Sequence, residues 1–324
     1  MRTHQAFQSD EAAINAYLDS LLTQRKLSGH TIDNYRRDLF QLHEMSKAIT
    51  LKELTHHQIR RFVSKLHASG MNPRSIARKL SAWRGFYQWL AEQTGLPFNP
   101  AETIKPPRQA KTLPKALSVD DAVQLVATPS SPPHHAQEDT LTPVCNRAMF
   151  ELLYSSGLRV SELTGLDVRH IREDGYTSFS WINLDDQELV VTGKGNKTRI
   201  VPIGLAAVDA IRTWLSVRNQ LVQPNEPDGL RALFINQRGR RMTPRIVQMR
   251  LKAHAKTLGL PLNVHPHVLR HSFASHVLQS SGDLRAVQEM LGHASIASTQ
   301  IYTALDFQHL AQIYDAAHPR AKKK

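Results

Sequence analysis

Apolar residues in the first 95 positions recur at the three-to-four-residue spacing of amphipathic helices. Ile14, Tyr17, Leu18 and Leu21 share one such face, and the same spacing returns in three later stretches. The later stripes are Ile32, Tyr35, Leu39 and Leu42; then Ile59, Phe62, Val63 and Leu66; and then Ile76, Leu80, Trp83, Phe86, Tyr87 and Leu90. We therefore predict four helices that bury these stripes in a bundle over residues 1–95.

Capping residues mark where two of these helices begin. Ser9 and Asp10 precede the first stripe, while Asn72 and Pro73 suit the cap and first turn of the fourth helix. The outer face of the fourth helix carries four basic residues, namely Arg74, Arg78, Lys79 and Arg84. They are candidates for contacting DNA phosphates, and a solvated helix surface is the alternative.

Residues 96–115 carry five prolines and little apolar periodicity, which is typical of an extended linker. A domain boundary is therefore expected here, and residues 116–324 form the second domain. Within that domain, the proline-rich and polar stretch 128–143 is predicted to be a surface loop.

The second domain combines helical patterns with a short region of strands. β-Branched runs broken by turn residues over 178–203 predict a small antiparallel meander. Helical patterns flank it at about 204–219, 243–258, 266–280 and 295–316. The expected fold is mainly α, with an N-terminal four-helix domain and an α+β domain that contains a small antiparallel sheet.

Length and composition restrict the class of protein. The chain has 324 residues, of which 41% are apolar and 21% charged; single cores seldom grow beyond about 250–300 residues, so two globular domains are favoured. It has no run of 18 apolar residues and no apolar signal segment, so neither membrane insertion nor secretion is expected. Cys145 is the one cysteine, which excludes an internal disulfide and fits a reducing cytoplasm.

Charge points to an anionic partner. The chain carries 41 Lys and Arg against 28 Asp and Glu, a net charge of +13. Residues 1–110 hold 16 basic and 9 acidic groups, so the first third contributes +7 of this excess. A nucleic acid is the natural partner of such a surface, although a basic surface without a partner is the alternative.

Two basic residues of the second domain follow glycine-containing turns. Arg159 lies just after Gly157 in GLRVSEL, at a predicted helix start where an anion can bind. Glu162 either orients Arg159 or lies on the helix surface. Lys194 lies between two glycines in the turn of the predicted hairpin, where the backbone can approach a ligand closely. Each residue by itself also fits an ordinary exposed surface.

Imidazoles and a further arginine follow near the C-terminus. His267, Arg270 and His271 lie at i, i+3 and i+4 in HVLRH, on one helical face. A zinc protease helix would need Glu where Val268 stands, so phosphate suits this cluster better than zinc. His293 in LGH is followed nine residues later by Tyr302.

GLRVSEL, the hairpin lysine, HVLRH, LGH and the tyrosine occur in one order that resembles the active-site set of the tyrosine recombinases of the phage integrase family. The resemblance covers both domains and the linker and is densest from residue 265 to residue 319. The stretch from residue 280 onward is similar to the bacterial recombinases that resolve chromosome dimers.

The resemblance implies a role for each matched side chain. Tyr302 would be the nucleophile that forms a 3′-phosphotyrosyl intermediate, and Arg159 and Arg270 would hold the phosphate. A free phenol loses its proton near pH ~10, so attack needs cations that stabilise the phenolate or a base that takes its proton.

The remaining matched residues would move protons and stabilise charge. Lys194 would protonate the leaving 5′ oxygen, His267 would assist proton transfer, and His293 would hydrogen-bond the phosphoryl group. The resemblance implies no cofactor and no metal, because these side chains would take the place of metal ions around the phosphate. It implies no ATP, because the phosphotyrosyl ester keeps the energy of the phosphodiester that it replaces.

The implied partners are duplex DNA with a dif-like site, a XerD-like recombinase in a heterotetramer and an FtsK-like translocase. A helix over about 306–316 would dock on a neighbouring protomer, and packing on its own domain is the alternative. Other functions remain open: a phage, transposon or integron integrase, a type IB topoisomerase, or a non-catalytic DNA-binding accessory protein.

Overall fold

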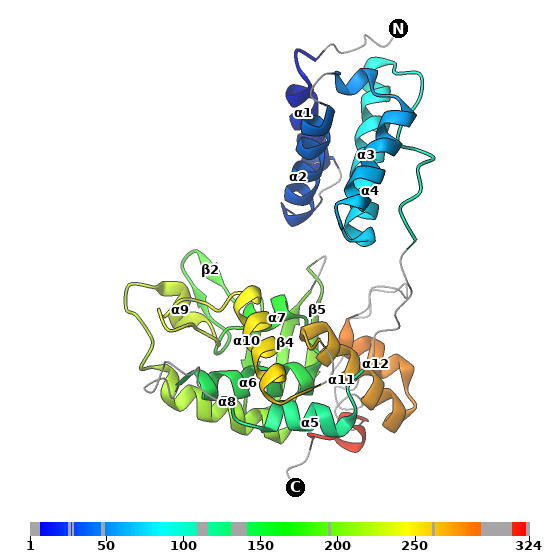
Figure 1. The fold of residues 1–324 in the computed structure, drawn as a ribbon. Coiled ribbons are helices and arrows are strands. Elements are labelled where there is room, and N and C mark those ends of the chain that lie inside the picture. Colours follow the sequence, from blue (N-terminus) through cyan, green and yellow to red (C-terminus); the bar gives the residue numbers. More distant parts are fainter. Residues whose placement is uncertain are drawn as a thin grey trace. The chain divides into compact units, whose positions relative to one another are not determined.

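The computed structural model describes residues 7–24, 27, 29–46, 49–108, 116–130, 141–193, 196–260, 263–292 and 313–321 (Figure 1). Contacts divide the chain into two compact units, Met1–Thr112 and Leu113–Lys324. Among the helices that this part of the chain forms, none is both long and apolar enough to span a bilayer.

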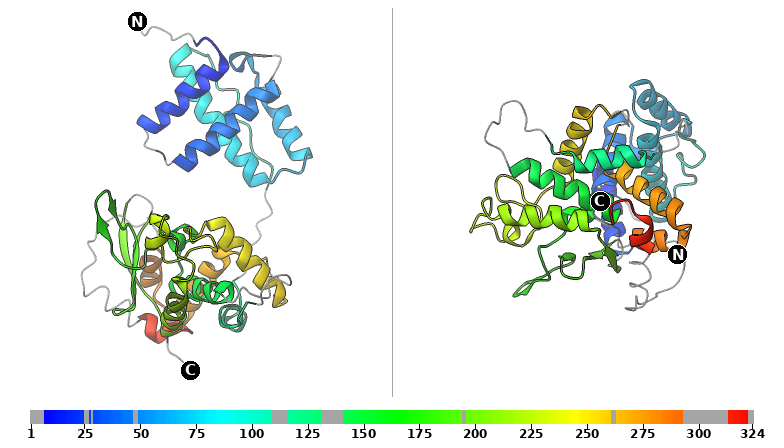
Figure 2. Two further views of the ribbon diagram at one scale, coloured as in Figure 1. Left: turned by 90° about the vertical axis from the view of Figure 1, so that its left-hand side faces the viewer. Right: turned by 90° about the horizontal axis from the view of Figure 1, so that it is seen from below.

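The N-terminal unit contains the four predicted helices. They are α1 (Asp10–Thr23), α2 (Gly29–Ser46), α3 (His56–Ala68) and α4 (Pro73–Thr94), and a 3₁₀ turn, η1 (Leu51–Glu53), precedes α3. Helix α4 packs against the other three helices (Figure 2). Ser9 and Asn72 cap α1 and α4 by accepting the backbone N–H groups of Ala12 and Arg74, as their positions in the sequence predict.

The aromatic stripe of α4 forms the core of this unit. Trp83, Phe86 and Tyr87 are fully buried, and full burial of a side chain of this size is worth about 1.5–3 kcal/mol. Their polar atoms are also satisfied, because Trp83 Nε1 donates to the Asp38 carbonyl at 3.0 Å and the Tyr87 hydroxyl donates to the Leu51 carbonyl at 3.0 Å. The prediction that this stripe is core is confirmed.

The C-terminal unit is a helical domain with two small sheets. Its helices are α5 (Val119–Ala127), α6 (Leu141–Ser156), α7 (Val160–Thr164), α8 (Leu205–Arg218), α9 (Pro227–Arg231), α10 (Pro244–Thr257), α11 (Pro266–Ser281) and α12 (Leu284–Leu291). Helix α6 lies at its centre and packs against α5, α8, α10 and α11. The helices predicted at 204–219, 243–258 and 266–280 correspond to α8, α10 and α11, whereas no helical range was predicted for α5, α6, α9 and α12. The pattern at 295–316 lies outside the described residues as far as residue 312.

The predicted meander is the larger sheet. Strands β3 (Trp181–Asn183), β4 (Glu188–Thr192) and β5 (Thr198–Pro202) are antiparallel, and Val191 pairs with Arg199. A second, two-stranded sheet of β1 (Arg172–Glu173) and β2 (Tyr176–Thr177) was not predicted. The β3–β4–β5 sheet brings β5 next to α12, and this contact matters for the site described below.

The described C-terminal segment, residues 313–321, packs on its own domain. The hydroxyls of Tyr314 and Ser155 share a 2.6 Å hydrogen bond, and Arg320 forms an ion pair with the buried carboxylate of Glu151. The Leu205 N–H donates to the Ala321 carbonyl at 3.2 Å. Docking of the 306–316 stretch on a neighbouring protomer stays a prediction, since Phe307, Leu310 and Ala311 lie outside the described residues.

His318 holds this segment as a neutral imidazole. Its Nε2–H donates to the Tyr154 carbonyl at 3.1 Å, and its Nδ1 accepts the Arg320 N–H at 3.1 Å. Burial is the main cause that lowers the pKa of His318 to about 3; the Tyr154 carbonyl opposes the shift, and nearby His276 and Arg320 contribute to it. Protonation of Nδ1 would remove the acceptor that Arg320 uses.

Acid should therefore weaken this unit through His318. An unfolded histidine takes a proton below pH ~6.5, whereas the folded one does not until about pH 3, so lowering the pH from 8 to 5 favours unfolding by about 2 kcal/mol. Urea unfolding of His318→Asn should show a loss between these pH values that is smaller by this amount. An exposed control, His170→Asn, should lose as much as the wild type; equal losses in all three proteins would contradict the assignment.

Candidate active site

Three elements of the C-terminal unit bring basic side chains to one carboxylate. Arg159 is the N-cap residue of α7, Glu162 lies within α7, Arg199 comes from β5 and Arg270 from α11. These segments are far apart in the sequence and gather in one region of the unit (Figure 1). The chain reaches Arg159 through Gly157, which has φ of 60°; a Cβ there would lie 2.4 Å from Phe273 Cδ1, so only glycine fits.

Glu162 is the common acceptor of the cluster. Its Oε1 accepts Arg159 Nη1 at 2.7 Å and Arg199 Nη1 at 3.1 Å, and its Oε2 accepts Arg199 Nη2 at 2.9 Å. Its Oε2 also accepts the Arg159 backbone N–H at 2.9 Å, and Arg270 Nη1 lies 4.0 Å from it. The structure thus shows that Glu162 orients Arg159 and does not lie on the helix surface.

Backbone carbonyls hold the second guanidinium. Arg270 Nη1 donates to the Gly157 carbonyl at 2.6 Å, and its Nη2 donates to the Leu291 carbonyl at 2.7 Å. Leu291 ends α12, where the carbonyls lack partners within the helix and carry the negative end of its dipole. Burial, together with the charges of Arg159 and Arg199, lowers the pKa of Arg270 to about 10, although the charge of Glu162 opposes the shift. Arg270 is therefore a buried cation whose positive charge is only partly compensated by the groups around it.

The charge balance of the cluster favours an anion. Three guanidiniums face one carboxylate, which leaves an excess of two positive charges among these four residues. Burial disfavours ionisation of Glu162, but the hydrogen bonds and charge of Arg199, together with the hydrogen bonds of Arg159, outweigh it and lower the pKa of the carboxyl group. Guanidinium donors match the oxygens of a phosphate. In the described ranges, no group of three or more His, Cys, Asp or Glu is placed to hold a metal ion.

The other predicted residues are placed as follows. His267 lies in the first turn of α11, one turn before Arg270; its side chain is exposed, and its ring centre lies 6.0 Å from that of His265. Lys194, His293 and Tyr302 lie outside the described residues. Their roles, like that of His267, stay predictions.

Arg199 is the residue that sequence reasoning missed. It stands within GKGNKTR, beside the predicted lysine, but strand position alone gave no reason to single it out. The sequence carries one signal, which is an arginine directly before the apolar residues of β5. In the sheet, Arg199 pairs with the buried Val191. A charged residue in such a place needs a buried partner.

Of the four basic residues of α4, three bond to other groups of the N-terminal unit and the fourth is exposed. Lys79 is buried, with its Nζ 2.7 Å from Asp38 Oδ1, and Arg78 contacts the other oxygen of the same carboxylate. The expected placement of Lys79 on the outer face is therefore wrong, because buried Asp38 needs a countercharge. Arg84 donates its Nε to the Ala101 carbonyl at 3.1 Å. Arg74 is exposed in the first turn of α4, and its contact with DNA stays a prediction.

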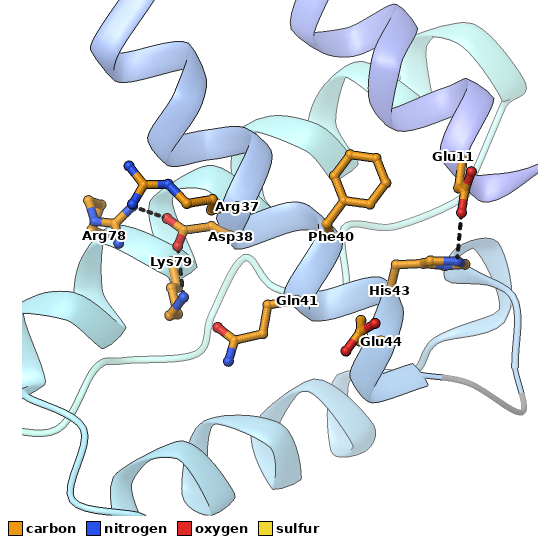
Figure 3. A pocket seen from close by; sticks show the side chains of 9 residues that line it. All are labelled: Glu11, Arg37, Asp38, Phe40, Gln41, His43, Glu44, Arg78 and Lys79. Atoms are coloured by element: carbon orange, nitrogen blue, oxygen red, sulfur yellow. Dashed lines mark hydrogen bonds and ion pairs between the residues drawn. The ribbon is translucent and has the colours of Figure 1, made fainter.

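The pocket beside Asp38 has balanced charge. Figure 3 shows its lining side chains, which come from α1, α2 and α4. The charged members are Glu11, Asp38 and Glu44 against Arg37, Arg78 and Lys79. This pocket therefore lacks the positive excess that distinguishes the cluster around Glu162.

Two family models match the chain. The model described as the phage integrase family matches residues 115–309, which is more than half of the chain. The model described as the phage integrase N-terminal SAM-like domain matches residues 14–94.

Curated relatives match over nearly the full length. Tyrosine recombinase XerC 1 of Ralstonia nicotianae is 54% identical over 317 residues, which cover 96% of this chain and 94% of the relative. Tyrosine recombinase XerC of Pseudomonas aeruginosa is 46% identical over 317 residues, which cover 97% and 96%.

Solved structures share the fold. A XerH recombinase bound to its difH substrate before cleavage has a TM-score of 0.64 at 21% identity, over 96% of this chain and 98% of that one. A lambda integrase dimer bound to a core site has a TM-score of 0.65 at 16% identity, over 97% and 79%. At these identities the likeness bears on the fold alone.

Removing the charge of Glu162 should destabilise the C-terminal unit. Glu162→Gln leaves Arg199 buried without a counterion, so we expect a loss of about 3–5 kcal/mol in urea unfolding at pH 7. Glu289→Gln, which breaks the exposed pair with Arg285, should cost less than about 1 kcal/mol.

The ion pair between Glu162 and Arg199 also predicts that stability depends on acid pH. Because the folded pKa of Glu162 lies below its ordinary 4.5, its contribution is present above about pH 4.5 and is lost as the pH falls through the folded value. Glu162→Gln should lack this part of the acid-induced loss. A variant with unchanged stability and unchanged acid dependence would contradict the central place of this carboxylate.

Proposed function

Because the chain belongs to the phage integrase family and is a site-specific tyrosine recombinase, we propose that it resolves chromosome dimers by strand exchange at a dif-like site. XerC is the chromosome-dimer recombinase that the C-terminal stretch resembles, and relatives at 54% and 46% identity carry that name.

One observation supports the chemistry above all others. Arg159 Nη1 lies 2.7 Å from Glu162 Oε1 and Arg270 Nη1 lies 4.0 Å from Glu162 Oε2, and the cluster keeps a positive excess. When a nucleophile attacks a phosphodiester, the equatorial oxygens of the phosphorane gain negative charge. Guanidiniums that are already in place stabilise this transition state more than the ground state, because no reorganisation is needed.

In the proposed reaction, the phenolic oxygen of Tyr302 attacks the scissile phosphorus. The bond from phosphorus to the 5′ oxygen breaks, so that the 3′ phosphate stays on tyrosine and a free 5′ hydroxyl leaves. His267 assists removal of the phenolic proton, Lys194 gives a proton to the 5′ oxygen, and His293 hydrogen-bonds the phosphoryl group.

The intermediate lets strands change partners. A phosphotyrosyl ester keeps the energy of the original phosphodiester, so a 5′ hydroxyl from either duplex can attack it and no ATP is consumed. Attack by the hydroxyl of the second duplex is recombination. All proposed donors are side chains of this chain, so no cofactor is assigned.

The proposed partners follow from the XerC relatives. We assign a XerD-like recombinase as the second pair of subunits in a heterotetramer on DNA, and an FtsK-like translocase as the regulator. The XerH relative in the solved structure is bound to difH, which is support from another protein for a dif-like site here. Because the proposed substrate is chromosomal DNA, we assign the protein to the cytoplasm.

A covalent trapping assay tests the nucleophile. The protein and its XerD-like partner are mixed, without metal, with a nicked suicide duplex that carries the dif-like site of the source genome. Wild type should give a protein–DNA band on a denaturing gel, and Tyr302→Phe should give none. A band in the phenylalanine variant would disprove the nucleophile, and no band with wild type would favour an accessory role.

The same duplex tests the phosphate clamp. Arg159→Lys and Arg270→Lys lose the two-pronged contact, so the rate of band formation at saturating DNA should fall about 10²–10³-fold. Arg212→Lys, an exposed arginine of α8, should stay within about twofold of wild type. Clamp variants that react at the rate of this control would contradict the assignment.

Exchange between paired sites distinguishes the remaining functions. We expect recombination of two dif-like sites and none between phage or transposon attachment sites. Relaxation of supercoiled DNA without exchange would instead indicate a topoisomerase.

A further inference from the structure

We propose that Arg199 is a positioning residue for strand cleavage, which holds Glu162 and through it the phosphate clamp of Arg159 and Arg270. The inference rests on the proposed function, because it assigns a role within that same site.

Arg199 has the geometry of a support and not of a phosphate ligand. Its side chain is 5% exposed, whereas that of Arg159 is 36% exposed. Each of its three guanidinium nitrogens donates to the protein: Nε to the Met290 carbonyl at 2.9 Å, and Nη1 and Nη2 to the two oxygens of Glu162 at 3.1 and 2.9 Å. A guanidinium engaged in this way is turned toward the protein.

The two-pronged contact fixes the plane of the Glu162 carboxylate. With both oxygens held by Arg199, the direction in which Oε1 meets Arg159 Nη1 is also set. A misplacement of about 1 Å at a reacting centre can cost about 10² in rate. Arg199 therefore acts on the clamp without touching the phosphate.

Arg199 and Arg270 also share a second anchor. They bind the carbonyls of Met290 and Leu291, which are adjacent at the C-terminal end of α12. Gly292 follows with φ of 63°, and a Cβ there would lie 3.1 Å from Arg199 Cδ. The tight fit ties the two arginines to one helix end, so their separation is set by the spacing of neighbouring carbonyls.

Charge balance gives Arg199 a second effect. If Arg199 were absent, only Arg159 and Arg270 would neutralise Glu162. The carboxylate would then compete with the phosphate for these two arginines. With Arg199 in place, a third cation shares the carboxylate with Arg159 and Arg270, so the four residues keep an excess of two positive charges for an anion. Stability does not require such a buried pair, since well-packed apolar residues of similar volume are often as stable.

Two variants of Arg199 test the proposal in the trapping assay. Arg199→Lys keeps the charge but loses the fork, and Arg199→Met keeps most of the volume but loses the charge. At saturating DNA we expect the rate of covalent-complex formation to fall about tenfold for lysine and about 10²-fold for methionine. The Kd for the same duplex should change less than about threefold, because Arg199 does not meet the DNA.

A matched control separates positioning from loss of structure. Arg218 of α8 is about as buried as Arg199. Its Nε and Nη2 donate to the carbonyls of Gly229, Leu230 and Ala232, and none of these hydrogen bonds involves Glu162. Arg218→Lys should keep the wild-type rate within about twofold in the fraction that is folded, which is measured by thermal unfolding. If Arg199→Met does not fold, the rate and the Kd of Arg199→Lys alone test the proposal.

Each outcome has one meaning. A lower rate with an unchanged Kd, absent from Arg218→Lys, supports the proposal. An unchanged rate, an equal loss in Arg218→Lys, or a loss that appears only in Kd overturns it. If wild type itself forms no covalent complex, the proposed function fails and not merely the role of Arg199.

Discussion

The active-site half of this chain depends on a single buried carboxylate. Glu162 accepts hydrogen bonds from Arg159 and Arg199 and lies 4.0 Å from Arg270. Without a negative charge between them, guanidiniums from three elements would repel one another at a buried place. The carboxylate makes their approach possible but does not cancel them, and the positive excess that remains is what a phosphodiester can use.

Buried acids with distant cations recur throughout the molecule. The other pairs are Asp38 with Arg78 and Lys79, Glu151 with Arg320, and Asp167 with Arg241. Each joins segments that are far apart in the sequence, and each acid is buried. Such pairs define which segments meet more than they add stability. They also mean that the count of 41 Lys and Arg overstates the number of cations that are free to meet DNA, because several are paired with buried acids, whereas the net charge of +13 already includes those acids.

The helical framework, the main sheet and the family followed from local pattern. Apolar spacing, the Asn72–Pro73 start and the turns around the meander act within a few residues, so they predicted α1 to α4, α8, α10, α11 and the β3–β5 sheet correctly. The tyrosine recombinase resemblance rested on short motifs and is confirmed by the family matches. Helices α5, α9 and α12 and the β1–β2 pair were missed because nine, five, eight and two residues are too short for a periodic pattern to stand out. Helix α6 has 16 residues but is buried on nearly all sides, so its sequence shows no single apolar face.

By itself, then, the sequence determined which residue types the site has and in which order, since motif spacing is written along the chain. Only tertiary structure decided which of them meet. Arg199 contacts Glu162 across 37 positions, Arg270 contacts Gly157 across 113, and Lys79 turns inward to Asp38 across 41. No local spacing encodes such contacts, because they depend on how whole helices and strands pack and on the cost of leaving a buried charge alone.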